Sequence, residues 1–473
     1  MKNTVRLSAA SIALAVASLL PNQVLAAPDS AELQAQIAEM RAQVEAMQSR
    51  IVALEAEVEA AHREDDAARA ASAATIASAA PVAAAAPVAA PNAPKETTKI
   101  TWKGAPQFST SDGWSFKLGG RLNMDAGVTD YPDSLGLEDG VGSELRRARL
   151  RVQGTVPGGF GYKFETDFAA SDVTITDAYM NYESKFQNGG SLEIIAGQHN
   201  TFQGLEELSS SLNTSFIERA AFTDAFEFER RLGLSAAYTK GAWLMQGGVF
   251  TDNIEDLSNR NYSVDGRLVY MPRFDGVQLH LGGSLHYAKL TGDFTEVRYR
   301  QRPFEHYSSE RFINTGTFEG ESERGIGLES AVIAGPFHAT GETYWQRVSR
   351  PGLADPTFFG GAFELGYFLT KGDTRGYKAG VFDHVKPAHP LGQGGIGAIQ
   401  VNARYDYLDL TDAGIVGGTQ NGYELSLIWT QTEWTRLMLN YAHLEYDDAA
   451  YATASGDRSY GVNVIAVRGQ VSF

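Results

Sequence analysis

The chain has 473 residues, of which 43% are hydrophobic, and its mean hydropathy is slightly negative at -0.23. It contains no cysteine, which excludes disulfides, thiolate metal sites and a lipid anchor on cysteine. The formal net charge of -17 argues against a nucleic-acid partner. After residue 26 no apolar run approaches the roughly 20 residues of a membrane helix, which excludes a helical membrane protein but not membrane-spanning strands.

Three segments precede the main body of the chain. Residues 1–26 are typical of a secretory signal, with Lys2 and Arg6 before an apolar stretch and a cleavage site before Ala27. Residues 27–65 predict a periplasmic coiled coil, because apolar residues repeat at alternating intervals of four and three. The repeat consists of Leu33, Ile37, Met40, Val44, Met47, Ile51, Leu54, Val58 and Ala61. A single amphipathic helix is the alternative, which the unbroken register disfavours. Residues 66–110, rich in alanine and proline, predict a semi-rigid linker.

From residue 111 to residue 473 apolar and polar side chains alternate in segments of about 9–14 residues, the length of a tilted membrane-spanning strand. No helical segment interrupts them to cover a sheet. This pattern predicts an all-β membrane protein, a closed transmembrane antiparallel β-barrel, in which apolar residues meet lipid and polar residues meet a wet lumen. We expect sixteen strands, with eighteen as the alternative, and the piece near residues 380–385 is the weakest candidate. Tight turns alternate with long polar loops near 129–143, 200–225, 290–322 and 447–460, as in outer-membrane proteins.

One predicted strand, residues 143–154, concentrates positive charge on one face. Period-two alternation places Arg147, Arg149 and Arg151 on that face, and Arg146 with Ala148, Leu150 and Val152 on the other. In a barrel the three arginines form a ladder along the lumen, whereas in a soluble sheet they are ordinary solvated charges. Seven of the 40 basic and ten of the 57 acidic residues precede residue 96, which leaves 33 and 47 in the rest of the chain.

Several segments together, in order, resemble the phosphate-selective porin family (porins O and P) over roughly residues 110–473. The segments are Arg146-Arg147-Ala148-Arg149-Leu150, residues 161–168, 177–182 and 196–198, Phe216-Ile217-Glu218-Arg219, and residues 366–372, 403–409 and 437–441. The resemblance implies a trimeric sixteen-stranded barrel, a third loop that folds inward, and an arginine ladder that leads anions to lysines. Where the family usually continues Lys-Glu-Pro-Phe-Gly, this chain has His199-Asn200-Thr201-Phe202-Gln203-Gly204.

These observations favour an outer-membrane porin for passive diffusion of small phosphate-like anions, without enzymatic activity, cofactor or metal. We expect the pore-lining anion-binding residues to be Lys117, Arg121, Arg147, Arg149, Arg151, Arg219 and Arg231. Outer-membrane lipid and two further copies of the chain are the expected partners. The alternatives are a porin without anion selectivity, an envelope tether whose coiled coil contacts the cell wall, and a barrel hydrolase. The hydrolase lacks support, because neither G-x-S-x-G nor H-E-x-x-H occurs, and His280 and His286 fit solvated lumen positions.

Overall fold

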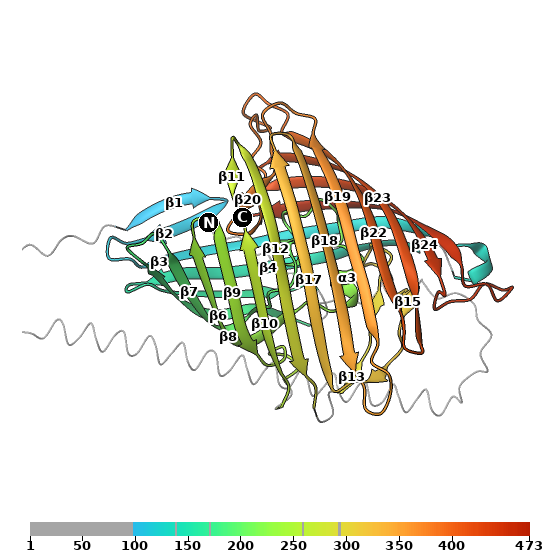
Figure 1. The fold of residues 1–473 in the computed structure, drawn as a ribbon. Coiled ribbons are helices and arrows are strands. Elements are labelled where there is room, and N and C mark those ends of the chain that lie inside the picture. Colours follow the sequence, from blue (N-terminus) through green and yellow to red (C-terminus); the bar gives the residue numbers. More distant parts are fainter. Residues whose placement is uncertain (1–97, 138–139, 170–171, 258–259, 292–294) are drawn as a thin grey trace, which may run out of the picture. The chain divides into compact units, whose positions relative to one another are not determined.

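The computed structural model describes residues 98–473 apart from 138–139, 170–171, 258–259 and 292–294, so the predicted signal, the coiled coil and most of the linker lie outside it. Sixteen strands form an antiparallel barrel (Figure 1). In order they are β3 (Ser115–Asp130), β4 (Gly140–Val156), β5 (Phe160–Asp167), β6 (Thr174–Lys185), β7 (Ser191–Asn200), β8 (Arg230–Lys240), β9 (Trp243–Phe250), β10 (Tyr262–Tyr270), β12 (Val277–Lys289), β17 (Ser322–Ala334), β18 (Phe337–Ser349), β19 (Thr357–Phe368), β22 (Ala398–Asp412), β23 (Ile415–Thr432), β24 (Thr435–Asp447) and β25 (Tyr460–Ser472). The barrel closes because β25 pairs with β3, from Asn463 opposite Asp130 to Ser472 opposite Arg121. The prediction of sixteen strands is confirmed.

The two faces of the wall follow the period-two pattern. Leucine, valine and aromatic side chains are exposed on the outside, whereas inward residues such as Asn123, Gln400 and Arg468 are buried. A wall with an apolar outside and a polar inside suits a cylinder surrounded by lipid. No helix in the described part of the chain is long and apolar enough to cross a membrane.

Adding a charge to the outer face should prevent stable insertion. Leu150 on β4 is 46% exposed on that face, so Leu150→Arg should cost about 2–4 kcal/mol near the middle of the hydrocarbon layer. The folded fraction can be measured by gel migration of unheated against boiled protein. Asn181→Arg adds the same side chain on the wet side of β6 and should fold nearly as well as the parent. Equal folding of Leu150→Arg and the parent would place Leu150 away from lipid.

Two strands before the barrel move the predicted linker boundary. β1 (Lys99–Lys103) and β2 (Ala105–Ser109) form an antiparallel hairpin, and β2 pairs with the start of β3 from Gln107 opposite Lys117 to Ser109 opposite Ser115. Residues 99–109, which we assigned to the linker, therefore extend the barrel sheet. β3 explains this, because its first residues extend beyond the end of β25, whose last pair is Ser472 opposite Arg121. The edge that β25 leaves uncovered forms hydrogen bonds with β2 instead.

The remaining short elements lie in the connections. They are η1 (Asp133–Leu135), α2 (Leu205–Leu208), α3 (Ala221–Ala225), β11 (Arg273–Phe274), β13 (Glu296–Val297), β14 (Arg300–Gln301), β15 (Ile313–Asn314), β16 (Phe318–Glu319), β20 (Gly376–Lys378) and β21 (Val381–Asp383). β20 and β21 pair only with each other, so residues 380–385 add no strand to the barrel wall, in line with the preferred count.

Long and short connections do not alternate as strictly as the sequence predicted. We call the end where β3 begins and β25 ends the terminus end, and the opposite end the loop end. Turns at the terminus end are short, except that residues 369–397 connect β19 to β22 there. At the loop end, β22 and β23 are joined by Ala413 and Gly414 alone. The predicted alternation of short and long connections is wrong at these two places. Residues 369–397 are long because they fold back into the lumen, where Arg375 contacts Asn213 and Ser215.

Candidate functional site

A bulge in β4 decides which of its arginines face the lumen. Asn123 of β3 pairs with Arg147 and Met124 pairs with Leu145, so Arg146 is the extra residue of the bulge. A bulge interrupts the alternation and re-aims a side chain. Arg146 therefore turns inward, where its Nε donates to Glu218 over 3.0 Å. The prediction that Arg146 shares the outer face with Leu150 is wrong for this reason.

One carboxylate is shared by three lumen arginines. Glu165 of β5 lies 3.5 Å from Arg121, 3.4 Å from Arg149 and 3.9 Å from Arg151. Of these three, Arg149 alone has a second carboxylate within ion-pair distance among the described residues, Asp167 at 2.7 Å. Three guanidinium groups around one shared acid leave an excess of positive charge along this part of the wall.

Arg147 has the fewest interactions of the ladder residues. Its side chain is 6% exposed, and one terminal nitrogen has no hydrogen-bond partner among the described residues. No ion pair to a carboxylate is found for it in the described part of the chain. A buried cation without a partner is costly, so a site of this kind gains from an anion that supplies the missing contacts.

Three cavities follow the same side of the barrel. The outer cavity, about 500 Å³, is lined by Arg146, Arg147 and Arg149 together with acidic residues of the loop after β7. The middle cavity, about 340 Å³, contains the ladder and also Arg121, Arg219 and Arg230. The inner cavity, about 290 Å³, includes Lys117 and lies nearest the start of β3. Because the outer and middle cavities share Arg147 and Arg149, and the middle and inner cavities share Lys163 and Tyr179, the three lie next to one another along the β3–β8 wall, and we refer to them together as the route.

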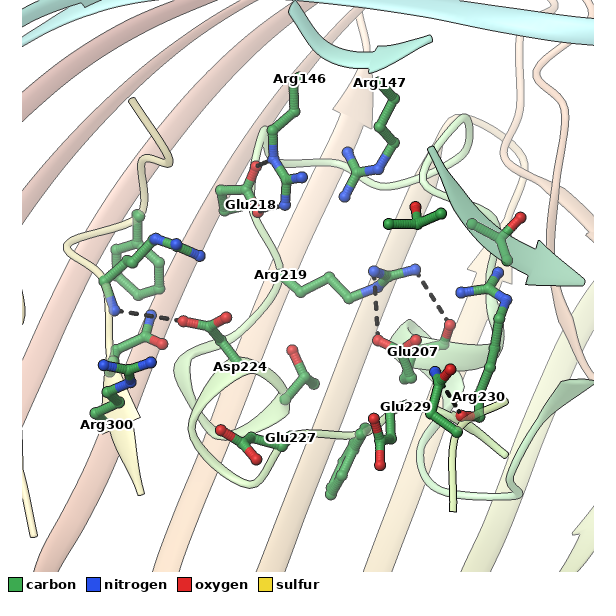
Figure 2. A pocket seen from close by; sticks show the side chains of 18 of the residues that line it. Arg146, Arg147, Glu207, Glu218, Arg219, Asp224, Glu227, Glu229, Arg230 and Arg300 are labelled. Carbon is green, nitrogen blue, oxygen red and sulfur yellow. Dashed lines mark hydrogen bonds and ion pairs between the residues drawn. The ribbon is translucent and has the colours of Figure 1, made fainter. Parts of the chain in front are cut away.

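Positive charge along this route peaks in the middle. The outer cavity is lined by eight arginines and seven carboxylates, and the inner cavity by two lysines and no carboxylate. The middle cavity has seven cationic side chains against three carboxylates, Glu165, Asp177 and Glu207. Figure 2 shows the outer cavity with Arg219 in the centre. Arg146 and Arg147 lie on one side of it, and the carboxylates of Asp224, Glu227 and Glu229 lie on the other. An acidic chain thus encloses a row of cavities of which the middle one is the most basic.

The rest of the lumen is filled by the inward loop, which we define as residues 201–229 between β7 and β8. Glu342 of β18 accepts hydrogen bonds from the backbone nitrogens of Leu205 and Glu206 over 2.7 and 2.9 Å. Arg404, Arg436 and Arg468, on β22, β24 and β25, donate to backbone carbonyls of the same loop. These anchors hold the loop against the β18–β25 side. On the other side it contacts Arg121 of β3 and Arg146 of β4, and the middle cavity lies between it and the wall.

The match to a known family covers the whole barrel. The family described as "Phosphate-selective porin O and P" matches residues 116–473. The chain belongs to this family. It is 46% identical over 391 residues to an uncharacterized protein of Caulobacter vibrioides, which covers 80% of this chain and 77% of the relative. It is 27% identical over 354 residues to Porin O of Pseudomonas aeruginosa, covering 68% of this chain and 78% of the relative.

Among solved structures, OmpT of Vibrio cholerae aligns with a TM-score of 0.47 at 10% identity, covering 77% of this chain and 98% of OmpT. The family and the closed barrel identify an outer-membrane porin channel.

Six of the seven predicted site residues line the route through this porin. Lys117 lines the inner cavity, Arg121 and Arg151 the middle one, and Arg147, Arg149 and Arg219 both the outer and the middle one. Arg231 lines none of the three and instead contacts Glu229 at 3.2 Å and Asp252 at 3.7 Å. Its neighbour Arg230, at the first position of β8, takes the expected place and pairs with Asp177 at 2.9 Å.

Two histidines differ from the expectation of solvated lining residues. His280 is 2.6 Å from the Tyr377 hydroxyl, and His286 is 2.7 Å from Asp265. Both are buried, because the connection 369–397 and the polar residues of β10 cover them. The sequence shows the lumen face correctly but does not show what lies inside the lumen.

The outer cavity should make ion selectivity depend on pH. Glu227 of the inward loop has a φ of 51°, a strained conformation of a kind that gathers at functional sites. Burial, and then the neighbouring Glu229 and Glu323, raises its pKa to about 7. A raised carboxyl pKa means that Glu227 is charged above this value and neutral below it. Anion preference should therefore increase as the pH falls from about 8 to about 6.

Reversal potentials measured at the two pH values test this expectation. Glu227→Gln fixes the neutral form, so it should show the low-pH selectivity throughout. If this variant keeps the full pH response of the parent, another group is responsible.

Proposed function

We propose that this porin passes small phosphate-like anions by passive diffusion along the β3–β8 wall. The observation that carries the proposal is the middle cavity, where three arginines share Glu165 and, among the described residues, Arg147 forms no ion pair with a carboxylate. The family resemblance to phosphate-selective porins supports the same solute class.

The chemistry of the ladder fits conduction rather than tight binding. Guanidinium groups stay charged and offer two parallel donors to the oxygens of a phosphate or carboxylate. Several sites in a row let an anion exchange one arginine for the next as it advances, and the nearby Glu165 and Asp167 keep each site weak. Weak, multiple binding is what a conducting channel requires.

A reversal-potential measurement in asymmetric potassium chloride tests the proposal. Full-length protein in planar bilayers should give a zero-current potential of the sign for chloride-selective pores, and added phosphate should reduce the chloride current. A potential of the opposite sign would reject anion selectivity. A potential near zero would favour a general porin, a reading that the nearly balanced charges of the outer cavity also allow.

Orientation and assembly complete the proposal. The terminus end faces the periplasm, with residues 27–65 as a coiled coil there, and three chains assemble in the membrane, as the family resemblance implies. Contact of the coiled coil with the cell wall remains a prediction outside the described residues. Crosslinking of the full-length protein in mild detergent should give three chains.

A further inference from the structure

Ile195, a large aliphatic residue, stands on the wet face of the barrel wall. On β7 the alternation places Ile194 outside, where it is 37% exposed, and Ile195 inside, where it lines the middle cavity. Lumen positions of this barrel are mostly polar or charged. An isoleucine facing water there gives up favourable burial of apolar surface, unless a solute covers it.

Ile195 belongs to an apolar wall formed with Tyr179, His199, Phe202 and Leu208, all of which line the middle cavity. The ring centroids of Tyr179 and His199 are 6.1 Å apart, and those of His199 and Phe202 are 6.4 Å apart. Both ring nitrogens of His199 are occupied, at 2.9 Å from the Gly197 carbonyl and 2.7 Å from the Ser235 hydroxyl. The imidazole therefore contributes ring surface to this wall rather than a free polar group.

The same cavity thus has a cationic side and an apolar side. The ladder on β4 and Arg121 on β3 supply the first, and the apolar wall supplies the second from β6, β7 and the start of the inward loop. Inorganic phosphate can use only the cationic side. An anion with an apolar body can use both sides at once.

We propose that the middle cavity is a binding site for organic anions that have one charged end and an apolar body, such as an aromatic carboxylate. This inference rests on the proposed anion route and specifies its solute. The carboxylate pairs with Arg147, one of whose terminal nitrogens has no hydrogen-bond partner among the described residues. The body lies against Ile195 and Leu208, which are half-buried, and releases water from them, a gain of about 25 cal/mol per Å² of apolar surface covered.

Block of the chloride current in planar bilayers tests the site, with benzoate, acetate and inorganic phosphate as probes on the full-length channel. Benzoate and acetate share the carboxylate and differ in the body. Benzoate should block at several-fold lower concentration than acetate. Ile195→Asn should weaken the benzoate block about fivefold, the factor for losing about 40 Å² of apolar contact, and should change the acetate block much less.

Ile194→Ala is the matched control, because it removes a similar side chain from the other face of the same strand. Leu208→Asn repeats the test if Ile195→Asn inserts poorly, because Leu208 lines the same cavity but does not belong to a barrel strand. Equal block by benzoate and acetate, or an unchanged benzoate block in the variants, would overturn the inference. The reversal potential of the same channels separates the two failures: a chloride-selective pore without benzoate preference loses the inference but keeps the proposed function.

Discussion

Replacing Arg147, Arg149 and Arg151 together with glutamate should turn an anion-preferring channel into a cation-preferring one. The middle cavity would change from seven cationic side chains and three carboxylates to four and six. Because charges in a narrow, low-dielectric passage act strongly on permeating ions, the chloride-to-potassium permeability ratio should fall by about tenfold or more. The effect should be largest in dilute salt and small near 1 M, where the Debye length is about 3 Å.

Two sets of controls make this result specific. Exchange of the same three arginines for glutamine should weaken anion preference without reversing it. Arg147→Gln should lower selectivity more than Arg231→Gln, since Arg231 lies outside the three cavities. A triple glutamate variant with the parent's selectivity in dilute salt would show that the ladder is not on the conduction path.

Arg404→Ala should lower the stability of the folded barrel by several kcal/mol and also release the inward loop. The Arg404 side chain is buried, lies 2.6 Å from Glu424 and 3.2 Å from Glu206, and donates to the Glu218 carbonyl over 3.1 Å. Removing one member of a buried charge network typically costs about 3–5 kcal/mol, because the remaining charges lose their partner. The thermal midpoint should fall, and single-channel conductance should become larger and noisier.

The double variant Arg404→Ala with Glu424→Gln is the matched control for this effect. It removes the carboxylate that the single variant leaves unpaired, so part of the lost stability should return. The conductance change should persist, because the loop carbonyl still lacks its donor. An unchanged midpoint and conductance in Arg404→Ala would mean that Arg404 does not hold the loop.

The barrel could be predicted from the sequence because polar and apolar residues alternate within each strand, and this alternation shows which face meets lipid and which meets the lumen. Leu150 and Arg149 are neighbours with opposite environments, and the alternation reports both. The bulge at Arg146 could not be read from spacing, although a charged residue on an otherwise apolar face was its signal. The shift from Arg231 to Arg230 has a different origin. β8 pairs with its neighbours without a bulge, and alternation gives the face of a residue on a strand but not its neighbours in the lumen.

The lumen contents were harder to predict because they depend on contacts between distant parts of the chain. Arg375, in the connection at the terminus end, donates to the Asn213 carbonyl over 2.6 Å and to the Ser215 hydroxyl. Nothing local to residues 369–397 indicates that this connection reaches the inward loop. Alternation puts Arg404, Arg436 and Arg468 opposite the apolar face of their strands, but it does not identify them as the groups that fix the loop.

The anchors of the inward loop also bear on the order of folding. Glu342 is 137 residues from Leu205 along the chain, and Arg468 is 251 residues from Ile217. Contacts of such long range form late, because the intervening chain must first be organised. Most of the anchors reside on β18 to β25, so the loop has few native contacts until the final strands pair and β25 reaches β3. A nascent or truncated barrel would therefore possess its arginines but lack the passage to which we attribute anion selectivity.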